Sequence, residues 1–327
     1  MISRLNGTPR LAAALRILCA CLILGTGGMA HAQQGQMTDK GQQVEEYLRG
    51  IFSSRKGVDV TAMTRKWLDI PYASLSQAEK LDIYLPEEGG GPFPVILAIH
   101  GGSFTAGDKR DFQIVPMLAA TRRGYAVVSI NYRLSGEARF PAQIHDVKAA
   151  IRWVRANAAR YSLAADKLAL WGDSAGGNLA ALAGVTGGTG VLEDKAMGNP
   201  EQSSQASAVV DWYGPIDFLT MGDPRRLEEK GNKLIGKTSL EAPELYRAAS
   251  PESHIRPGVP PILIQHGDAD QVIALGQSVH FAARLRAALG EKVVALDVLK
   301  GADHLDERFT TPENIARVLD FLDGHLR

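Results

Sequence analysis

Short apolar runs alternate with longer amphipathic segments along most of this chain. Residues 81–85 alternate apolar and polar side chains, which is the pattern of a strand with one exposed face. Continuous apolar runs predict further strands at 95–99, 125–130, 167–171, 208–212, 261–265 and 293–299. Strands that alternate with helices in this way form mostly parallel sheets with helices on both faces. We therefore predict an α/β fold built on such a central sheet.

Amphipathic segments between these runs predict the helices. In residues 144–159 the apolar side chains recur at three- and four-residue steps, so they share one helical face that should pack on the sheet. These side chains are Ile144, Val147, Ala150, Ile151 and Val154. Residues 178–183 and 312–326 also have helical composition. Residues 215–251 are polar, charged and partly helical, so we expect a small insertion over the sheet, of the kind that forms a lid.

The amino-terminal segment has the pattern of a signal peptide. Arginines precede an apolar run at 17–24, and the small residues Ala30 and Ala32 offer a cleavage site. An uncleaved membrane anchor is the alternative, but the run is much shorter than the about 20 apolar residues that a membrane-spanning helix needs. We therefore expect residues 1–32 to be removed during export, leaving a periplasmic or secreted protein without a membrane span.

The rest of the chain is expected to form one domain. Residues 33–70 are polar and weakly patterned, with a short helix around 44–52, and we interpret them as a lead-in without evident chemistry. From there the alternation of apolar and amphipathic segments continues. Residues 71–327 are therefore predicted to form a single catalytic domain, with 215–251 as its possible lid.

Composition narrows the possible functions. Of the 327 residues, 45% are hydrophobic and 22% are charged, which is typical of soluble globular proteins. Lys and Arg total 36, as do Asp and Glu, so no net field attracts the chain to nucleic acid or anionic lipid. Both cysteines, Cys19 and Cys21, lie in the predicted signal peptide. The mature protein would therefore have no disulfide, cysteine nucleophile or thiolate metal site.

Residues 172–176, Gly-Asp-Ser-Ala-Gly, match the pattern Gly-x-Ser-x-Gly. This pattern forms a tight turn between a strand and a helix, and the turn exposes the serine hydroxyl at the carboxyl end of a sheet. A predicted strand precedes the motif and a predicted helix follows it, as the turn requires. The alternative is a glycine-rich turn that only packs the helix on the strand. The context favours Ser174 as a nucleophile.

A serine hydroxyl becomes nucleophilic when an imidazole accepts its proton and a carboxylate orients that imidazole. Around a Gly-x-Ser-x-Gly turn the partners follow the serine in the order acid, then histidine. Of the histidines downstream, His304 follows the last predicted strand in a loop that could return over Ser174. His280 lies in a helical stretch, and His266 is more typical of a turn-stabilising residue. We therefore predict His304 as the base.

Two carboxylates follow the strand at 261–265 and are both candidates for the acid, Asp268 and Asp270. Each lies where a strand end can present a side chain to the site, and the position alone leaves the choice open. Asp303 and Asp306 flank His304 and could suggest a metal site. Two carboxylates and one histidine without a second cluster of ligands make a poor metal site, so we expect solvated loop residues and no metal or cofactor.

Attack on an ester also requires donors for the negative charge that develops on the carbonyl oxygen, and fixed backbone N–H groups supply them. The amide of Ala175 begins the helix after the nucleophile. Residues 100–104, His-Gly-Gly-Ser-Phe, follow a predicted buried strand, where small side chains let the backbone approach a substrate. We predict Gly102 and Ser103 as the other two donors. A plain glycine turn is the alternative for this segment.

These motifs together resemble those of the α/β-hydrolase superfamily, in particular its hormone-sensitive-lipase-like branch and its bacterial carbohydrate and feruloyl (acetyl) esterases. The resemblance extends over about 81–304 and rests on 100–104, 131–134, 172–178, 266–273 and 301–304. It implies the α/β-hydrolase fold, with a mostly parallel central sheet. It also implies that Asp270 is the acid and that the amides of Gly102, Ser103 and Ala175 form the oxyanion hole.

Two departures from the resembled proteins bear on the substrate. Ser103 stands where many hormone-sensitive-lipase-like proteins have a third glycine, and no large cap precedes Leu81. The resemblance therefore favours an esterase for small acyl groups, acetyl or feruloyl, on a small molecule or carbohydrate. A serine peptidase of the prolyl-oligopeptidase kind and a non-catalytic binding protein of the same fold are the alternatives. The natural ester and the oligomeric state are not indicated by the sequence.

Overall fold

A single mixed sheet organises the residues that the computed structural model describes, 57–221 and 232–327. Its strand order is β1-β2-β4-β3-β5-β6-β7-β8. The strands are β1 (Lys66–Pro71), β2 (Lys80–Tyr84), β3 (Phe93–Ile99), β4 (Ala126–Ile130), β5 (Leu163–Asp173), β6 (Ala208–Trp212), β7 (Ile262–Gly267) and β8 (Val294–Leu299). Strand β2 pairs antiparallel with both β1 and β4, and the remaining neighbours, from β4-β3 to β7-β8, pair parallel. The predicted mostly parallel sheet is confirmed.

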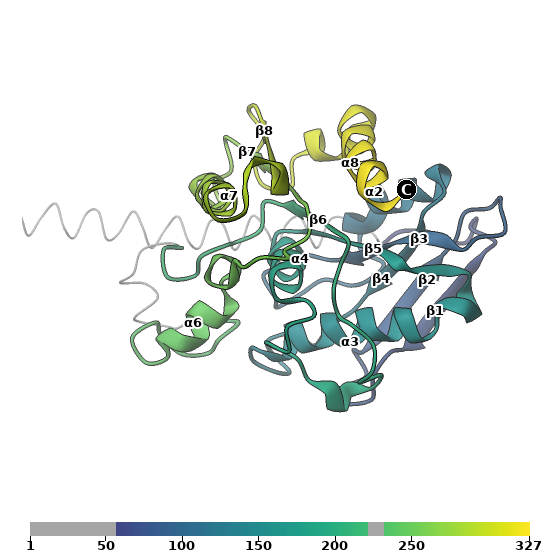
Figure 1. The fold of residues 1–327 in the computed structure, drawn as a ribbon, viewed down its shortest axis with the longest axis horizontal. Helices are drawn as coiled ribbons and strands as arrows, with labels where there is room; N and C mark the ends of the chain where they lie inside the picture. The colour runs from purple at the N-terminus through teal and green to yellow at the C-terminus, as the bar shows by residue number, and fades with distance from the viewer. Residues whose placement is uncertain (1–56, 222–231) are drawn as a thin grey trace, which may run out of the picture. The chain divides into compact units, whose positions relative to one another are not determined.

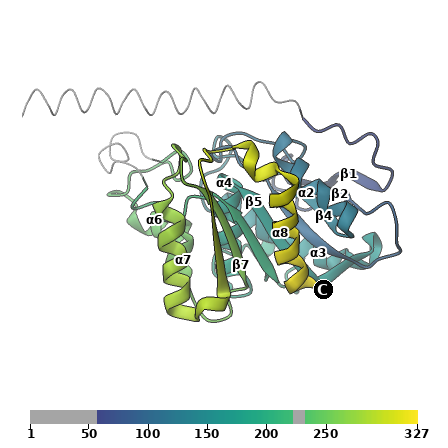
Figure 2. The ribbon, with the colours of Figure 1, turned by 90° about the horizontal axis from the view of Figure 1, so that it is seen from above.

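Helices cover both faces of this sheet, as the alternating pattern predicted. They are α2 (Val115–Leu118), α3 (Ala142–Ala156), α4 (Ala175–Thr186), α6 (Pro243–Ala249), α7 (Gly276–Leu289) and α8 (Pro312–Leu326). Figure 1 shows α2 and α8 on one side of the sheet and α3 on the other, and Figure 2 shows α8 lying across the strands. Because both faces are covered, the side chains of β3 and β4 are almost entirely buried, which explains their continuous apolar runs.

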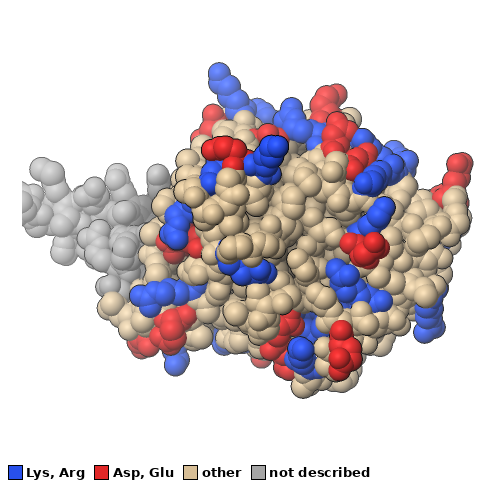
Figure 3. Space-filling view, in the orientation of Figure 1, with Lys and Arg blue, Asp and Glu red and all other residues tan. Residues whose placement is uncertain are grey.

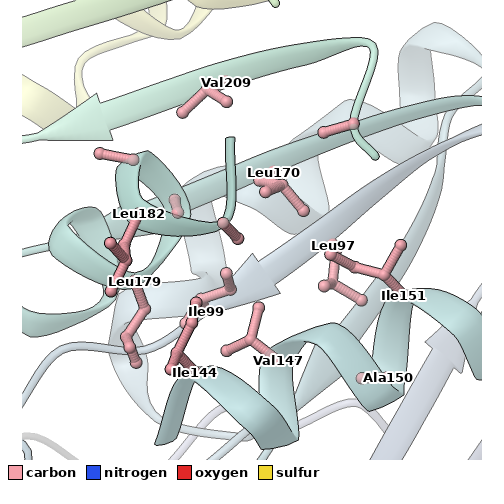
Figure 4. Close-up of a cluster of buried hydrophobic side chains, with 14 of the residues drawn as sticks. Leu97, Ile99, Ile144, Val147, Ala150, Ile151, Leu170, Leu179, Leu182 and Val209 are labelled. Atoms are coloured by element: carbon pink, nitrogen blue, oxygen red, sulfur yellow. The ribbon is translucent and has the colours of Figure 1, made fainter. Parts of the chain in front are cut away.

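The core between α3, α4 and the sheet follows the predicted apolar stripe. All five residues of the stripe in 144–159 are buried. Figure 4 shows side chains of α3 facing those of β3, with α4 beside them. The labelled residues are Leu97 and Ile99 of β3, Leu170 of β5, Val209 of β6, Ile144, Val147, Ala150 and Ile151 of α3, and Leu179 and Leu182 of α4. This packing holds α4, and with it the start of that helix, firmly on the sheet.

The register of the central strands brings two loops together. Ile99 at the end of β3 pairs with Gly172 near the end of β5. In a parallel pair both strands end at the same edge of the sheet. The segment that follows Ile99 and the turn that follows Gly172 therefore lie side by side, which is the arrangement that the predicted oxyanion hole requires.

The sheet begins earlier than predicted. All of strand β1 except Pro71 lies within the segment 33–70 that we expected to be a lead-in, and Lys66 pairs with Tyr84 of β2. The prediction missed this strand because β1 is an edge strand whose side chains are mostly exposed, so its sequence lacks a buried pattern. The predicted signal peptide at 1–32 and the predicted helix around 44–52 lie outside the described residues.

The described part of the 215–251 segment packs into the core. Phe218 and Tyr246 are buried, and the backbone N–H of Phe140 donates to the carbonyl oxygen of Leu234. The described part of this segment contains the helix α6, which agrees with the partly helical composition that we noted in the sequence. Whether the segment acts as a lid remains a prediction.

Among the described helices, none is both long and apolar enough to cross a membrane. On the face shown in Figure 3, acidic and basic side chains are interspersed.

Candidate active site

Ser174 occupies a strained turn between β5 and α4. Its backbone has φ 50° and ψ −118°, a conformation that residues with a side chain rarely adopt. A Cβ atom on Gly172 would lie 2.2 Å from the carbonyl oxygen of Gly176, so the turn closes only if position 172 is glycine. The motif at 172–176 therefore forms the tight strand-to-helix turn that the sequence predicted.

Three residues that are distant in the sequence meet at this turn. Nε2 of His304 lies 3.0 Å from Oγ of Ser174, and Nδ1 of His304 lies 2.8 Å from Oδ2 of Asp270. A carboxylate can only accept, so Nδ1 carries the proton and the lone pair of Nε2 faces the serine hydroxyl. The side chains of His304 and Asp270 are fully buried. The geometry suits proton transfer from Ser174 to His304.

The two candidate acids have different partners. Oδ1 of Asp268 accepts the backbone N–H of Gly301 at 2.5 Å, which stabilises the loop that precedes the histidine. Asp270 alone of the pair contacts His304, and its Oδ1 also accepts the backbone N–H groups of Val272 and Ile273, each at 2.8 Å. The structure therefore places Asp270, as the resemblance implied, where an orienting carboxylate belongs.

Hydrogen bonds keep the carboxyl group of Asp270 ionised. Burial alone would raise its pKa, but hydrogen bonds from His266 and His304, the charge of His304 and the backbone N–H of Ile273 together lower it well below the usual range. An ionised Asp270 can stabilise the imidazolium that forms when His304 takes a proton. The contact with His266 was not predicted, because the sequence indicated only a turn-stabilising role for that residue.

The predicted oxyanion donors lie on adjacent loops. Gly102 and Ser103 have φ 108° and 54°, and a Cβ on Gly102 would lie 2.2 Å from the carbonyl oxygen of Ala106. Ala175 is the first residue of α4, where helical N–H groups lack intrahelical partners and the helix dipole favours negative charge. Within the described part of the chain, the N–H groups of these three residues donate to no protein atom. They are available to an oxyanion.

Residues 131–132 hold the oxyanion loop in place. The hydroxyl of Tyr132 donates to the carbonyl oxygen of His100 at 2.9 Å, and the two rings stack with centroids 4.4 Å apart. Oδ1 of Asn131 accepts the backbone N–H of Lys109 at 2.5 Å. Burial lowers the pKa of His100, so the stacked ring is neutral. The sequence analysis noted the motif at 131–134 but did not assign it a role. That role depends on the pairing of β4 with β3, which places Tyr132 beside His100.

The residue before the nucleophile links the two loops. The carboxyl group of Asp173 accepts hydrogen bonds from the side-chain amide of Gln113, at 2.5 Å, and from the backbone N–H of Gly101. Burial first, and then the charge of Asp111, raise the pKa of Asp173 to about 8. The group is therefore largely neutral at pH 7. A neutral carboxyl group does not oppose the formation of an oxyanion nearby.

The remaining polar residues of the site have structural partners. Asp303 accepts backbone N–H groups of Gln271 and His304, and Asp306 contacts Arg308. In the described ranges, no group of three or more His, Cys, Asp or Glu side chains is placed to hold a metal ion. The ring of Tyr213 lies edge-on to that of His304, with centroids 4.7 Å apart. This contact, which the sequence did not reveal, limits the orientations of the imidazole.

The fold and the site together define the class of this protein. The protein is an α/β-hydrolase. Its sheet has this strand order, its strained serine turn follows β5, and Asp270 and His304 follow β7 and β8. The chain belongs to the BD-FAE family, whose model matches residues 81–285. The α/β-hydrolase fold and the esterase resemblance expected from the sequence are confirmed.

Several known proteins that resemble this chain carry the name esterase. Esterase LipC of Mycobacterium tuberculosis (strain ATCC 25618 / H37Rv) is 35% identical over 65% of this chain and 53% of its own length. Esterase LipQ of the same strain is 32% identical over 72% of this chain and 56% of its own. The chain thus spans about half the length of the curated relatives that it matches. A solved truncated carbohydrate esterase from gut microbiota has a TM-score of 0.74 and 35% identity, covering 83% of this chain and 99% of its own.

Proposed function

We propose that this protein is a serine carboxylic-ester hydrolase that removes small acyl groups, of the acetyl or feruloyl type, from small-molecule or carbohydrate esters. The observation that carries the proposal is the relay from Ser174 through His304 to Asp270, with distances of 3.0 Å and 2.8 Å. Nucleophile, base and orienting acid are all within hydrogen-bond reach, which is what acyl transfer by a serine requires.

The reaction would proceed in two steps. Oγ of Ser174 attacks the carbonyl carbon while Nε2 of His304 takes the hydroxyl proton, and the amides of Gly102, Ser103 and Ala175 bind the resulting oxyanion. The intermediate collapses as His304 returns the proton to the departing alcohol, which leaves an acyl group on the serine. Water then gives a proton to His304 and attacks this acyl-enzyme. The second collapse releases the acid and restores Ser174. These residues perform the chemistry without a cofactor.

The names of the relatives support ester hydrolysis more strongly than they support a particular ester substrate. LipC and LipQ carry the name esterase, and the solved neighbour from gut microbiota is called a carbohydrate esterase. Ser174, His304 and Asp270 would act in the same way for any leaving alcohol. Specificity for the alcohol is therefore determined by other parts of the binding site. The preference for small acyl groups and the carbohydrate alcohol are accordingly parts of the proposal.

Substitution of the nucleophile tests the proposal. The full-length Ser174→Ala variant should hydrolyse short p-nitrophenyl esters more slowly than the parent by roughly 10⁴-fold or more. The matched control is Ser103→Ala, because Ser103 is exposed and contributes only its backbone N–H. If Ser174→Ala retains the parent rate, Ser174 is not the nucleophile.

A second measurement separates this proposal from its alternatives. A fluorophosphonate probe should label the parent and leave Ser174→Ala unlabelled, whereas a non-catalytic protein of the same fold should remain unlabelled throughout. Comparing acyl esters with peptide amides of equal size then distinguishes an esterase from a serine peptidase. Faster turnover of the amides would favour the peptidase.

We further propose that residues 1–32 act as a signal peptide and that the protein is periplasmic or secreted. The arginines, the apolar run at 17–24 and the Ala30-x-Ala32 site support this proposal. Mass spectrometry of protein expressed from the full-length sequence in a bacterium should find a mature chain that begins at Gln33. A chain recovered only from the cytoplasm with its first residues intact would contradict export.

A further inference from the structure

A second histidine lies on the same carboxylate oxygen that His304 contacts. Nε2 of His266, near the end of β7, is 3.2 Å from Oδ2 of Asp270, and Nδ1 of His304 is 2.8 Å from that oxygen. All three side chains are fully buried. Oδ2 is thus shared between two imidazoles, while Oδ1 accepts two backbone N–H groups.

The partners of His266 determine where its proton lies. Nε2 faces two acceptors, Oδ2 of Asp270 and the carbonyl oxygen of Ile273 at 2.9 Å, so Nε2 must carry a hydrogen. Nδ1 lies 2.7 Å from the hydroxyl of Ser278 in α7, which can donate to it. A neutral imidazole with its proton on Nε2 satisfies all of these contacts. The single Nε2–H of His266 is therefore shared between the carbonyl oxygen of Ile273, at 2.9 Å, and Oδ2 of Asp270, at 3.2 Å.

We propose that His266 is a positioning residue for Asp270, whose Nε2–H holds Oδ2 where it accepts from His304 and shares the negative charge that stabilises the imidazolium of His304. This inference rests on the proposed function, because it concerns the same relay. His266 touches neither Ser174 nor a substrate, so it acts only through the acid.

A purely structural role would not require the third contact. The bonds to Ser278 and Ile273 already connect the end of β7 to α7 and to the loop after the acid. The contact with Asp270 adds a donor to an oxygen that must also serve His304. Burial raises the pKa of Asp270, but the hydrogen bonds from His266 and His304, together with the charge of His304 and the backbone N–H of Ile273, lower it overall, which agrees with a charge-sharing role.

Other titratable groups lie near His266, Asp270 and His304 on neighbouring elements. A test of His266 must leave the interactions of these groups unchanged. Tyr213 lies edge-on to His304, and Asp211 in β6 interacts electrostatically with His266. Asp303 lies beside His304 in sequence and accepts its backbone N–H. Asp268 and Asp306 contact the backbone of the same two loops. Tyr213 also lies edge-on to His266, with ring centroids 6.5 Å apart. The hydrogen bonds of Asp268, Asp303 and Asp306 given above do not involve His266, so its replacement leaves them in place.

Two substitutions separate the donor from the rest of the ring. The amide nitrogen of a glutamine reaches about as far as Nε2, so His266→Gln retains a donor toward Asp270. His266→Asn keeps a polar group only near the position of Nδ1, facing Ser278. Loss of the donor leaves more negative charge on Oδ2, and that charge favours the protonated form of His304.

The test is the pH dependence of kcat/KM for a short p-nitrophenyl ester with the full-length protein. In His266→Asn, we expect kcat/KM to fall about tenfold and its acidic limb to move up by about 0.5 to 1 pH unit. KM should change less than kcat, because His266 meets no substrate. His266→Gln should restore most of the rate and the parent position of the limb. Ser278→Ala, which retains the Nε2–H, should lower the melting temperature and leave the limb in place.

The outcomes distinguish the two proposals. A parent protein that neither hydrolyses esters nor reacts with a fluorophosphonate contradicts the proposed function itself. An active parent whose Asn and Gln variants share its acidic limb overturns the positioning role and leaves the function standing. If His266→Asn does not fold, His266→Phe replaces it, since the benzene ring fills the site without a donor. An unshifted limb in that variant overturns the proposal equally.

Discussion

A methyl group on the Cα atom of Gly176 would lie 2.0 Å from the carbonyl oxygen of Ile99. The nucleophile turn is thus in direct backbone contact with the end of β3, from which the oxyanion loop departs. No side chain fits between them. The distance between Ser174 and the proposed oxyanion donors of the loop after β3 is therefore set by backbone packing rather than by adjustable side chains.

This contact predicts that Gly176→Ala is strongly destabilising. Either the turn or β3 must move, and overpacking of this kind typically costs about 1–3 kcal/mol. Urea unfolding of the variant should show a lower midpoint, and ester hydrolysis should fall with it. Gly136→Ala is the control, since a Cβ at Gly136 meets nothing within 4 Å. Equal stability of the two variants would contradict the close approach.

The choice between two neighbouring carboxylates gives a second prediction. Asp270→Asn should lower kcat by about 10⁴-fold, because an amide facing Nδ1 favours the wrong imidazole tautomer. Asp268→Asn should retain activity to within about tenfold, because within the described residues the Asp268 side chain accepts only the backbone N–H of Gly301 and so acts on loop stability. Ester hydrolysis at pH 7 decides between them. A large loss in Asp268→Asn alone would reverse the assignment of the acid.

Much of this site was predictable because its motifs are local. The turn at 172–176 depends on glycines two positions either side of the serine, and a pattern of five residues encodes it. The closing helix was predicted at 312–326, the bounds that α8 has, because its amphipathic stripe and first-turn proline are local signals. The motifs also named Ser174, Asp270 and His304, which the structure brings within hydrogen-bond reach of one another.

Two contacts that the sequence analysis did not predict depend on how separate segments of the chain pack together. The stacking of Tyr132 on His100 exists only because β4 lies beside β3. The contact of His266 with Asp270 requires the loop after β7 to fold back on its own strand. Strand β1 was missed for a different reason: an exposed edge strand has no buried face to impose a pattern.

The oxyanion loop gives a third prediction. Gly102→Ala should abolish most of the activity, because φ 108° is unfavourable for alanine and its Cβ would lie 2.2 Å from the carbonyl oxygen of Ala106. Loss of one oxyanion donor typically lowers kcat by about 10² to 10³-fold. Ser103→Ala keeps the backbone N–H and should remain close to the parent. Measurements of kcat for both variants test whether the backbone, rather than a side chain, supplies the donor.

The raised pKa of Asp173 predicts a pH-dependent stability. Between its ordinary pKa of 3.8 and its folded value of about 8, the folded protein holds a proton that the unfolded chain releases. The contribution of this group to the free energy of unfolding therefore falls as pH rises through that window. Asp173→Asn cannot titrate, so its stability relative to the parent should increase from pH 5 to pH 8. Urea midpoints at pH 5, 6.5 and 8 provide the measurement, and an unchanged difference would show that Asp173 is ionised throughout.

Ser174 and His304 are separated by 130 positions in the chain, and the last strand of the sheet forms between them in sequence. A nascent or cleaved polypeptide that lacks β8 would contain the serine turn and the oxyanion amides but would have no base. Such a fragment would be inert toward esters. Hydrolysis of a chromogenic ester could consequently report when refolding is complete, because the signal would begin only after the carboxyl-terminal strand has docked.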